Sequence, residues 1–412
     1  MSRFLPLLLA CVFAAPPVVS AAVVGTNPPA RPLTASLLAT LPKEEEAAWQ
    51  RYLARSKQRH AMDQAFLEEE MAKAGLSEQL VPPRGRAVSL RQPDAWYGSD
   101  EAGKMAVCVI SFQTPAGGWN KNTRMTERPR LRGERFGFEE GYVGTFDNDA
   151  TITELQFLAK VIAAGDSEAA AASRRAFGRG LEYIFAAQYP NGGWPQVWPL
   201  EGGYHDAITF NDGAMTHVLR FLRDVSEGKN EFAFVSGELR ARAADSMNQG
   251  LACLLKAQIT VKGKRTVWCQ QYDLLTVEPT SARNYEMPSQ SSGESADILT
   301  FLMEFEKPAP EVTAAVHSGA AWFKKTMIAG KVFKNTGEDG RRLVDAPPDT
   351  QTWPRFAEIG SDRPLFGDRD RTIHDVVDEI SRERRNGYAW YNGSGANLLK
   401  RYEKWAEKFP AK

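Results

Sequence analysis

The sequence has few of the side chains on which familiar hydrolases and zinc enzymes depend. Its 412 residues include 5 His and 4 Cys, and none of the His lies in a recognisable triad pattern. It contains no Gly-x-Ser-x-Gly nucleophile elbow, no His-Glu-x-x-His zinc motif and no Gly-x-x-x-x-Gly-Lys phosphate-binding loop. The standard hydrolytic and nucleotide-binding mechanisms are therefore poor explanations of this chain.

An excess of charge of either sign is also missing. Lys and Arg number 51, Asp and Glu number 51, and the formal net charge is zero. No global field attracts nucleic acid or an anionic membrane, so any anion must be bound by a local cluster. With 43% hydrophobic and 25% charged residues, the chain is globular, and its length allows one large core or two ordinary ones.

Long apolar runs are confined to the first residues. The stretch 4–15 follows Arg3, is well short of the roughly 20 residues that span a bilayer, and leads to small residues around Ala21. We predict a signal peptide over 1–22, cleaved near Ala21, and a secreted or periplasmic protein. The alternative is a lipoprotein, because Leu-Leu-Ala-Cys11 resembles a lipidation site that would tether the chain to a membrane.

Disulfide bonds are not expected to dominate the fold. Without the leader, the cysteines that remain are Cys108, Cys253 and Cys269, so at least one thiol is unpaired. A bridge between Cys253 and Cys269 stays open as an alternative. Their spacing fits no zinc-binding pattern.

The composition changes along the chain in a way that suggests a modular order. Residues 23–42 are rich in Ala, Pro and Thr and are predicted to be a linker. Residues 43–88 are predicted to be an N-terminal helical segment, because 44–74 carry a helical apolar stripe. Residues 89–412 are predicted to form the main domain.

An internal repeat gives the strongest indication of the fold. Residues 113–119 read Gln-Thr-Pro-Ala-Gly-Gly-Trp, 188–194 read Gln-Tyr-Pro-Asn-Gly-Gly-Trp, and a looser copy runs from Gln258 to Trp268. Helical patterns separate these turns, and few apolar β-branched runs occur. We predict an all-α fold, an α/α toroid of antiparallel helical hairpins with long loops and little β structure. The expected helices are 151–164, 167–187, 211–226 and 238–257.

Two long polar stretches, 264–290 and 330–372, show weak periodicity and are predicted to be functional loops.

Two acidic pairs stand where helices are expected to begin. These are Asp147-Asn148-Asp149 and Asn211-Asp212, and their equivalent places in successive repeats predict that they face one another. Several carboxylate and amide oxygens at one place suit a hard cation. Helix capping is the simpler alternative.

Arginines in the long loops are candidates for binding an acidic substrate. Arg283 lies in the Pro-bounded stretch 278–288, and Arg355 and Arg369 follow in the second loop. The planar guanidinium matches the two oxygens of a carboxylate. The alternative is that these arginines are surface charges or pair with the interleaved aspartates.

These segments resemble pectate lyases of polysaccharide lyase family ten. The resemblance is carried by residues 147–151, 211–213 and above all 278–290, and it continues through 113–122, 188–196, 353–356 and 387–395. It covers nearly all of 90–405. It implies an α/α toroid and a calcium-dependent enzyme that cleaves polygalacturonate by anti β-elimination, giving 4,5-unsaturated oligogalacturonates.

The resemblance also implies a role for each candidate residue. Arg283 corresponds to the base that removes the C5 proton. The implied substrate-binding residues are Arg355, Arg369, Lys121 and Asn148, and the implied calcium ligands are Asp147, Asp149 and Asp212. A free arginine has a pKa above about 12 and is a weak base near neutral pH, so an alkaline optimum is the expected consequence.

Two other functions remain open on the residues alone. A toroid glycoside hydrolase would use Asp147 or Asp149 with Asp212 as acid and base. A non-catalytic pectin-binding protein would need no base at all. In each case the partner is a polysaccharide. Nucleic acid is not expected, a membrane is expected only if Cys11 is lipidated, and the chain is expected to be a monomer.

Overall fold

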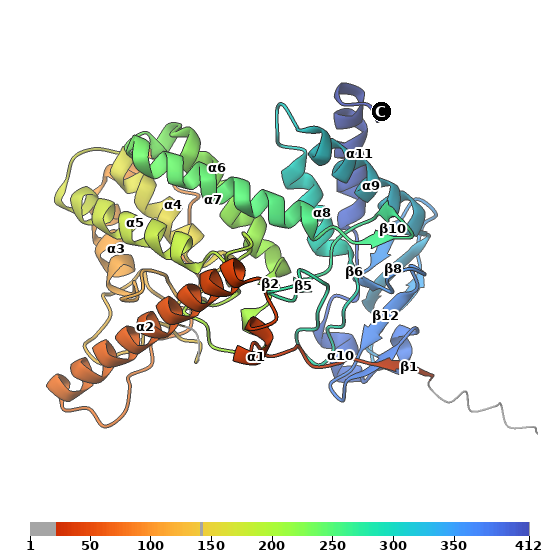
Figure 1. The fold of residues 1–412 in the computed structure, drawn as a ribbon, viewed down its shortest axis with the longest axis horizontal. Helices are drawn as coiled ribbons and strands as arrows, with labels where there is room; N and C mark the ends of the chain where they lie inside the picture. Colours follow the sequence, from red (N-terminus) through yellow and green to blue (C-terminus); the bar gives the residue numbers. More distant parts are fainter. Residues whose placement is uncertain (1–21, 141–142, 412) are drawn as a thin grey trace, which may run out of the picture.

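The computed structural model describes residues 22–140 and 143–411, so the predicted leader with Cys11 and Ala21 lies outside the described part. Figure 1 shows a lobe of helices α2 to α7 on one side and, on the other, helices α8, α9 and α11 beside the sheets. The described part contains 11 α-helices, and the chain is 47% helical. The predominantly helical character predicted from the repeats is confirmed.

The helices begin and end close to where their sequence signals place them. Ser99, Ser167 and Ser236 each accept a hydrogen bond from a backbone N–H in the first turn of a helix, and Gly75 ends α2 in the left-handed conformation. The α-helices are α1 (Ala35–Leu38), α2 (Lys43–Ala74), α3 (Asp100–Ser111), α4 (Ile152–Ala163), α5 (Glu168–Ala187), α6 (Ala214–Glu227), α7 (Gly237–Lys256), α8 (Ser292–Leu302), α9 (Pro310–Thr326), α10 (Arg382–Gly387) and α11 (Ser394–Lys408).

The repeated glutamine has the same role in all three copies of the turn. In consecutive pairs, α4 packs on α5, α6 on α7 and α8 on α9. Gln113 Nε2 donates to the carbonyls of Gly117 and Ala176, at 2.8 and 2.9 Å. Gln188 and Gln258 make the equivalent pair of bonds, at 2.9 to 3.1 Å. The glutamine therefore ties its turn to the second helix of the pair that follows, which is α5, α7 or α9, and the looser third copy is a true repeat.

The tryptophan of each turn is buried and joined to the preceding helix. The indole N–H groups of Trp119, Trp194 and Trp268 donate to helix carbonyls at 2.8 to 3.0 Å. Trp353 makes the same bond, to the carbonyl of Phe323 at 2.8 Å, and so adds a fourth member that the sequence pattern does not reveal. A hydrogen bond that satisfies the indole inside a core fixes the position of each turn on its helix.

Close backbone approach explains a glycine in two of these turns. Gly117 has φ +110°, and a Cβ there would lie 2.6 Å from the carbonyl oxygen of Arg179. Gly192 has φ +92°, and its Cβ would lie 2.3 Å from the carbonyl oxygen of Gln249. Any other residue would have to displace the helix against which the turn rests.

The stretch 330–372 is not a plain loop but a set of short antiparallel strands. The largest sheet has the order β1-β13-β12-β11-β6 (Figure 1). Its strands are β1 (Val23–Thr26), β13 (Thr372–His374), β12 (Pro364–Gly367), β11 (Phe356–Ala357) and β6 (Gln290–Ser291). Strands of two to five residues offer too few alternations for a period of two to stand out, which is why the sequence predicted a loop.

The other strands belong to smaller pairings. One sheet of three strands has the order β14-β10-β7, and the rest are two-stranded. Their bounds are β2 (Ile208–Thr209), β3 (Thr260–Val261), β4 (Lys264–Arg265), β5 (Gln271–Tyr272), β7 (Ile328–Ala329), β8 (Lys331–Asn335), β9 (Arg341–Asp345), β10 (Gln351–Pro354) and β14 (Tyr391–Asn392).

The residues before the main domain are built into it. In the stretch predicted to be a linker, β1 pairs antiparallel with β13 across the sheet. In α2, the Tyr52 hydroxyl donates to the carbonyl of Ala187 at 3.0 Å, and Asp63 accepts from the backbone N–H of Ala116 at 2.8 Å. Frequent proline predicts low helix and strand content, but not whether an extended stretch finds an open sheet edge to pair with.

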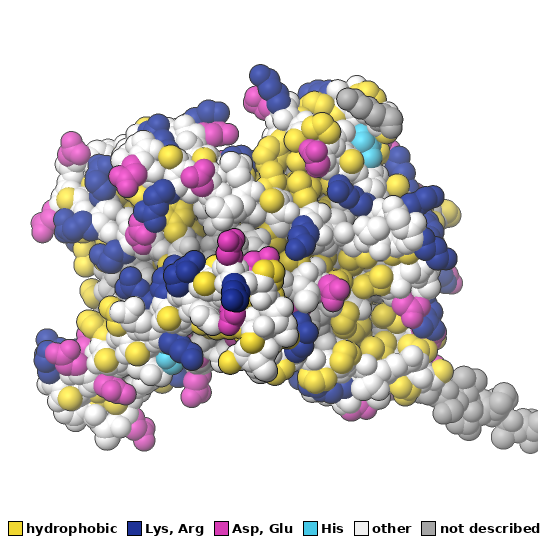
Figure 2. All heavy atoms as spheres, in the orientation of Figure 1, with side chains coloured by type: hydrophobic (Ala, Val, Ile, Leu, Met, Phe, Trp, Pro, Cys, Tyr) yellow, Lys and Arg dark blue, Asp and Glu magenta, His cyan; other side chains and the backbone are white. Residues whose placement is uncertain are grey.

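The described residues contain two hydrophobic cores, and the larger one extends from the lobe of α2 to α7 into α8, α9 and α11. The larger core fills the helical pairs, and the smaller one lies under the sheet and includes Tyr285, Phe356 and Trp390. None of the helices in residues 22–140 and 143–411 has the length and apolar character needed to cross a membrane. On the face drawn in Figure 2, Lys and Arg are dispersed among Asp and Glu, as the balanced charge requires.

Candidate functional site

The two acidic pairs lie against each other, as their places in the repeats predict. Asp147–Asp149 form the 3-10 turn η2 before α4, and Asn211–Gly213 form the turn η4 before α6. Asn148, Asp149 and Asp212 have φ of 52°, 61° and 50°. Left-handed backbone in residues other than glycine costs roughly 1 kcal/mol or more at each position and gathers at functional sites. Neither pair is a simple helix cap, since no side chain of either turn caps its helix.

Asp147 and Lys121 meet at the centre of this region. Asp147 is 4% exposed, and its Oδ2 accepts a hydrogen bond from Lys121 Nζ. Its other oxygen, Oδ1, is buried without a hydrogen-bond partner in the described residues, and so is Oδ1 of Asn211. Buried oxygens without donors are costly unless a cation or water satisfies them.

Asp212 brings a second carboxylate to the same place. Burial raises its pKa, and the nearby Asp147 and Glu294 raise it further, against the opposing effect of Arg355. Its side chain accepts from Asn211 Nδ2 at 2.9 Å. Carboxylates that raise one another's pKa gain stability when a cation is placed between them. Within the described ranges, no group of three or more His, Cys, Asp or Glu is arranged to hold a metal.

Asp149 points away from these two carboxylates. Its side chain is 54% exposed and forms an ion pair with His217 Nδ1. Burial lowers the pKa of His217, but Asp149 outweighs this effect and the pKa is raised. His217, on the first turns of α6, is a residue that the sequence analysis missed, although its place one helical turn after Gly213 was a usable signal. Asn148 is exposed at the tip of the turn.

Arg355 and Glu294 form a buried ion pair beside the acidic turns. Arg355 Nη2 lies 2.8 Å from Glu294 Oε1, and the two side chains are 16% and 4% exposed. Burial works against the charged guanidinium, but Glu294 together with Tyr388, Glu286 and Asp212 outweighs it and raises the pKa of Arg355. Glu294 also accepts from the hydroxyl of Ser291. The sequence analysis did not assign Glu294 to the site, because an acid in the first turn of a helix is most simply explained by the helix dipole.

Arg283 is held by Glu286, three residues later. Arg283 Nε and Nη2 lie 2.8 and 2.5 Å from the two oxygens of Glu286, and the backbone N–H of Arg283 donates to the same carboxylate at 3.0 Å. Burial works against the charged form, but Glu286 outweighs it and raises the pKa of Arg283. The guanidinium is therefore a stable cation in this structure, 41% exposed beside a carboxylate that is 3% exposed.

Tyr388 connects Arg283 with Arg355. Its hydroxyl donates to Glu286 Oε1 at 2.6 Å. The Cζ atoms of Arg355 and Arg283 lie 4.6 and 5.7 Å from the centre of its ring. A continuous series of contacts therefore runs from Glu294 through Arg355 and Tyr388 to the Arg283 loop, and Arg355 also acts electrostatically on Asp212 in the acidic turns.

Arg369 lies at the outer end of the series. It is 62% exposed and pairs with Glu383 at 2.9 Å. Its carbonyl oxygen accepts from Asn284 Nδ2 at 2.9 Å, and its side chain lines a cavity of about 470 Å³ together with Arg283 and Tyr285. The structure therefore brings Arg283 and Arg369 to one cavity and puts Arg355 behind Tyr388.

The side chain of Asn27 holds the backbone of the Arg283 loop in place. Its side chain is 1% exposed, and Nδ2 lies 3.1, 2.8 and 3.1 Å from the carbonyl oxygens of Arg283, Asn284 and Glu286. The backbone N–H of Asn27 donates to the carbonyl of Arg371 at 2.8 Å. A residue in the predicted linker thus fixes the backbone of the candidate catalytic loop, which no local pattern indicates.

The cysteines take no part in this site. Cys108, Cys253 and Cys269 are all buried free thiols, so the alternative of a Cys253–Cys269 bridge is wrong. Burial raises the pKa of all three thiols, to about 12 in Cys253, and so keeps them protonated and unreactive.

The comparisons with known proteins agree with this geometry. Residues 113–399 match the family model described as pectic acid lyase. A family 10 polysaccharide lyase from Cellvibrio cellulosa has 32% sequence identity and a TM-score of 0.67, over 78% of this chain and 99% of that one. A second structure, an alanine mutant of the lyase from that organism in complex with trigalacturonic acid, has 32% identity and a TM-score of 0.66, over 77% and 96%. A search of curated proteins found no match.

Proposed function

The chain belongs to the pectate lyases of polysaccharide lyase family 10, and from this premise we propose that it cleaves polygalacturonate by calcium-assisted anti β-elimination. The observation that carries the proposal is an arrangement in which the charge of Arg355 acts on Asp212 in the acidic turns, while contacts through Tyr388 connect Arg355 with Arg283. It places buried oxygens suited to a cation next to two guanidinium groups suited to carboxylates. The similar structure that holds trigalacturonic acid supports an oligogalacturonate as the substrate.

Elimination demands charge stabilisation at the carboxyl group of the sugar. Removal of the C5 proton leaves negative charge spread over the adjacent carboxylate, and cations placed there stabilise the transition state. We assign this role to Arg355, which Glu294 holds charged and in place. Arg369, Lys121 and Asn148 are proposed to bind neighbouring parts of the substrate.

Arg283 is proposed as the base that removes the C5 proton. Only the neutral guanidine can accept a proton, and Glu286 favours the charged form. The rate should therefore rise with pH as the neutral fraction of Arg283 grows. Arg283→Lys and Arg283→Ala are both expected to lose lyase activity, and wild-type activity in either would remove Arg283 from this role.

The residues of the acidic turns fit a calcium ion. Asp147 Oδ1 and Asn211 Oδ1 are buried oxygens without partners in the described residues, and Asp212 carries a carboxylate with a raised pKa. Amide and carboxylate oxygens together are the ligands that calcium prefers, and because the ion takes about six to eight oxygens, backbone carbonyls, water or the uronate would complete the set. Bound calcium would neutralise these acids and draw a uronate carboxylate toward them. Asp149, the third predicted ligand, would have to leave His217 to contribute.

The remaining parts of the proposal concern architecture and location. The three antiparallel helical pairs support an α/α toroid. Residues 1–22 are proposed to direct the chain out of the cytoplasm, residues 43–88 to brace the domain, and residues 89–412 to form the lyase domain, which is proposed to act as a monomer.

A direct assay separates this function from its alternatives. The protein without its leader is incubated with polygalacturonate and calcium, and the ultraviolet absorbance of the C4–C5 double bond is followed. Elimination creates that bond, whereas a glycoside hydrolase would release saturated reducing ends and no absorbance, and a binding protein would release nothing. Loss of absorbance on chelation, restored by added calcium, is the second expected result.

A further inference from the structure

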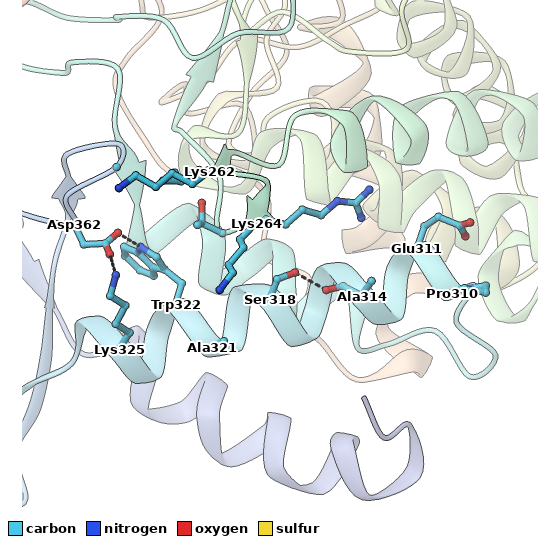
Figure 3. A pocket seen from close by; sticks show the side chains of 14 residues that line it. Lys262, Lys264, Pro310, Glu311, Ala314, Ser318, Ala321, Trp322, Lys325 and Asp362 are labelled. Atoms are coloured by element: carbon cyan, nitrogen blue, oxygen red, sulfur yellow. Dashed lines mark hydrogen bonds and ion pairs between the residues drawn. The ribbon is translucent and has the colours of Figure 1, made fainter. Parts of the chain in front are cut away.

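A large cavity in the described part of the chain lies outside the candidate site. It has a volume of about 1030 Å³ and lies between helix α9 and the hairpin of β3 and β4 (Figure 3). None of the candidate catalytic, substrate-binding or calcium-binding residues lines it. We name it the α9 groove, and its charged lining suggests a binding surface of its own.

The hairpin carries three cations to the edge of the α9 groove. Lys262 and Gly263 form its turn with φ of +49° and +77°, which is the left-handed pair that a tight two-residue hairpin turn requires. Lys264 and Arg265 follow at once in β4, and with Lys262 they line the groove. All three side chains are exposed, and within the described ranges none of them forms an ion pair.

The opposite end of the groove is already neutralised. Lys325 Nζ lies 2.5 Å from Asp362 Oδ2, and Asp362 Oδ1 accepts from the indole N–H of Trp322 at 2.9 Å. Glu311 is the other acid in the lining. The excess positive charge therefore comes from the hairpin, and it is local, because the chain as a whole has no net charge.

The floor of the groove between these charges is mostly apolar. Ala314 and Ala321 lie along α9 with Ser318 and Trp322, as Figure 3 shows, and Val261 of the hairpin also belongs to the lining. A ligand suited to this lining has carboxylates along one edge and C–H faces along another. An acidic polysaccharide combines these two properties, whereas a phosphate or a simple anion would leave the apolar floor unused.

We propose that the α9 groove binds a second segment of a polygalacturonate chain, away from the place of cleavage. The inference rests on the proposed function, since it takes the polymer that the lyase cleaves as its ligand. A second contact keeps a long substrate near the enzyme and raises its effective concentration at the cleavage site. Trigalacturonate is too short to gain from it.

The test compares short and long substrates in a charge-reversed variant. In Lys264→Glu/Arg265→Glu, two exposed cations become acids, and the Lys262–Gly263 turn is kept. The matched control is Lys400→Glu/Arg401→Glu, an adjacent exposed pair on α11 with the same change of net charge. For each protein, KM and kcat are measured with trigalacturonate and with polygalacturonate, and retention on immobilised polygalacturonate is measured at low and high salt.

The groove variant should have KM for polygalacturonate raised about fivefold, from the loss of two attractive contacts and the gain of two repulsive ones. Its kinetics on trigalacturonate and its kcat should stay at the wild-type values, and the control should match the wild type on both substrates. The groove variant should also be retained less on the polymer at low salt.

Two results would overturn the inference. One is an equal effect of both variants on polygalacturonate, which would show a response to net charge alone. The other is wild-type KM and retention in the groove variant. If the wild-type protein instead produces no unsaturated product from either substrate, the proposed function fails. In that case, the comparison of wild-type and groove-variant retention on immobilised polygalacturonate still tests whether the α9 groove binds the polymer.

Discussion

Replacing Asn27 with alanine should disable the Arg283 loop without touching the substrate. Asn27 Nδ2 lies within 3.1 Å of three loop carbonyls, and the side chain is 1% exposed. The carbonyls of Arg283 and Glu286 keep backbone donors, from Glu286 and Ala282 at 2.8 and 3.1 Å, so alanine orphans the carbonyl of Asn284, which costs about 1 to 3 kcal/mol. Since Arg283 carries the first of these carbonyls, the loop and its guanidinium should shift together.

The expected effect is on catalysis more than on binding. A displacement of about 1 Å in a reacting group can lower the rate about a hundredfold, so kcat for Asn27→Ala should fall by about ten- to a hundredfold. KM should change little, because Arg355 is held independently by Glu294. The measurements are kcat and KM for polygalacturonate at several pH values, together with the melting temperature.

The control comes from the same stretch of chain. Arg31→Ala removes an ion pair with Asp273 at 3.0 Å whose arginine is 49% exposed, and such pairs contribute about 0 to 1 kcal/mol. Its kcat should equal that of the wild type. The reasoning is refuted if Asn27→Ala keeps the wild-type kcat, or if its loss of activity is fully explained by the fraction of unfolded protein.

Three further predictions concern titratable side chains. Burial raises the pKa of Asp63 to about 7, above its value in the unfolded chain. The free energy of unfolding should therefore fall by about 4 kcal/mol as the pH rises from about 4 to above 7. Asp63→Asn should flatten this pH dependence in melting curves measured at several pH values. Asp212→Asn should weaken calcium binding about tenfold or more in calorimetry. Without calcium, the same variant should have a higher melting temperature, because it removes a carboxylate with a raised pKa. Asp149→Asn, which changes an exposed carboxylate, should lose less calcium affinity than Asp212→Asn. Glu286→Gln removes the anion that keeps Arg283 protonated, so the rising limb of the pH–rate profile should move to lower pH, and an unmoved limb would argue against an arginine base.

Local patterns predicted the helices and turns well because their causes are local. The apolar periodicity and the Gln–Gly-Gly–Trp turns placed α4, α5 and α7 within one or two residues of their observed ends. The repeat also predicted that Asp147 and Asp212 would meet, since equivalent helix starts in adjacent pairs must lie at the same end.

The direction in which each acidic side chain points, and the residue with which it pairs, could not be predicted in the same way. Asp149 turns to His217 and Asp147 turns to Lys121, although the two acids are two residues apart and were expected to bind one cation. Backbone with positive φ at Asn148 and Asp149 decides this, and it depends on the packing of α4 against its neighbours.

The sequence alone determined the class of this protein: a repeated helical scaffold, a set of acids and arginines suited to a uronate, and a family resemblance that the comparisons bear out. Tertiary structure alone decided which of those side chains work together. Asn27 is 256 residues from Arg283, and Glu294 is 61 residues from Arg355. Pairings between residues so far apart in the sequence are set by how sheets and helices pack. The entropy cost of closing a long loop grows slowly with its length and is offset by core packing, so no local sequence pattern records which residues pair.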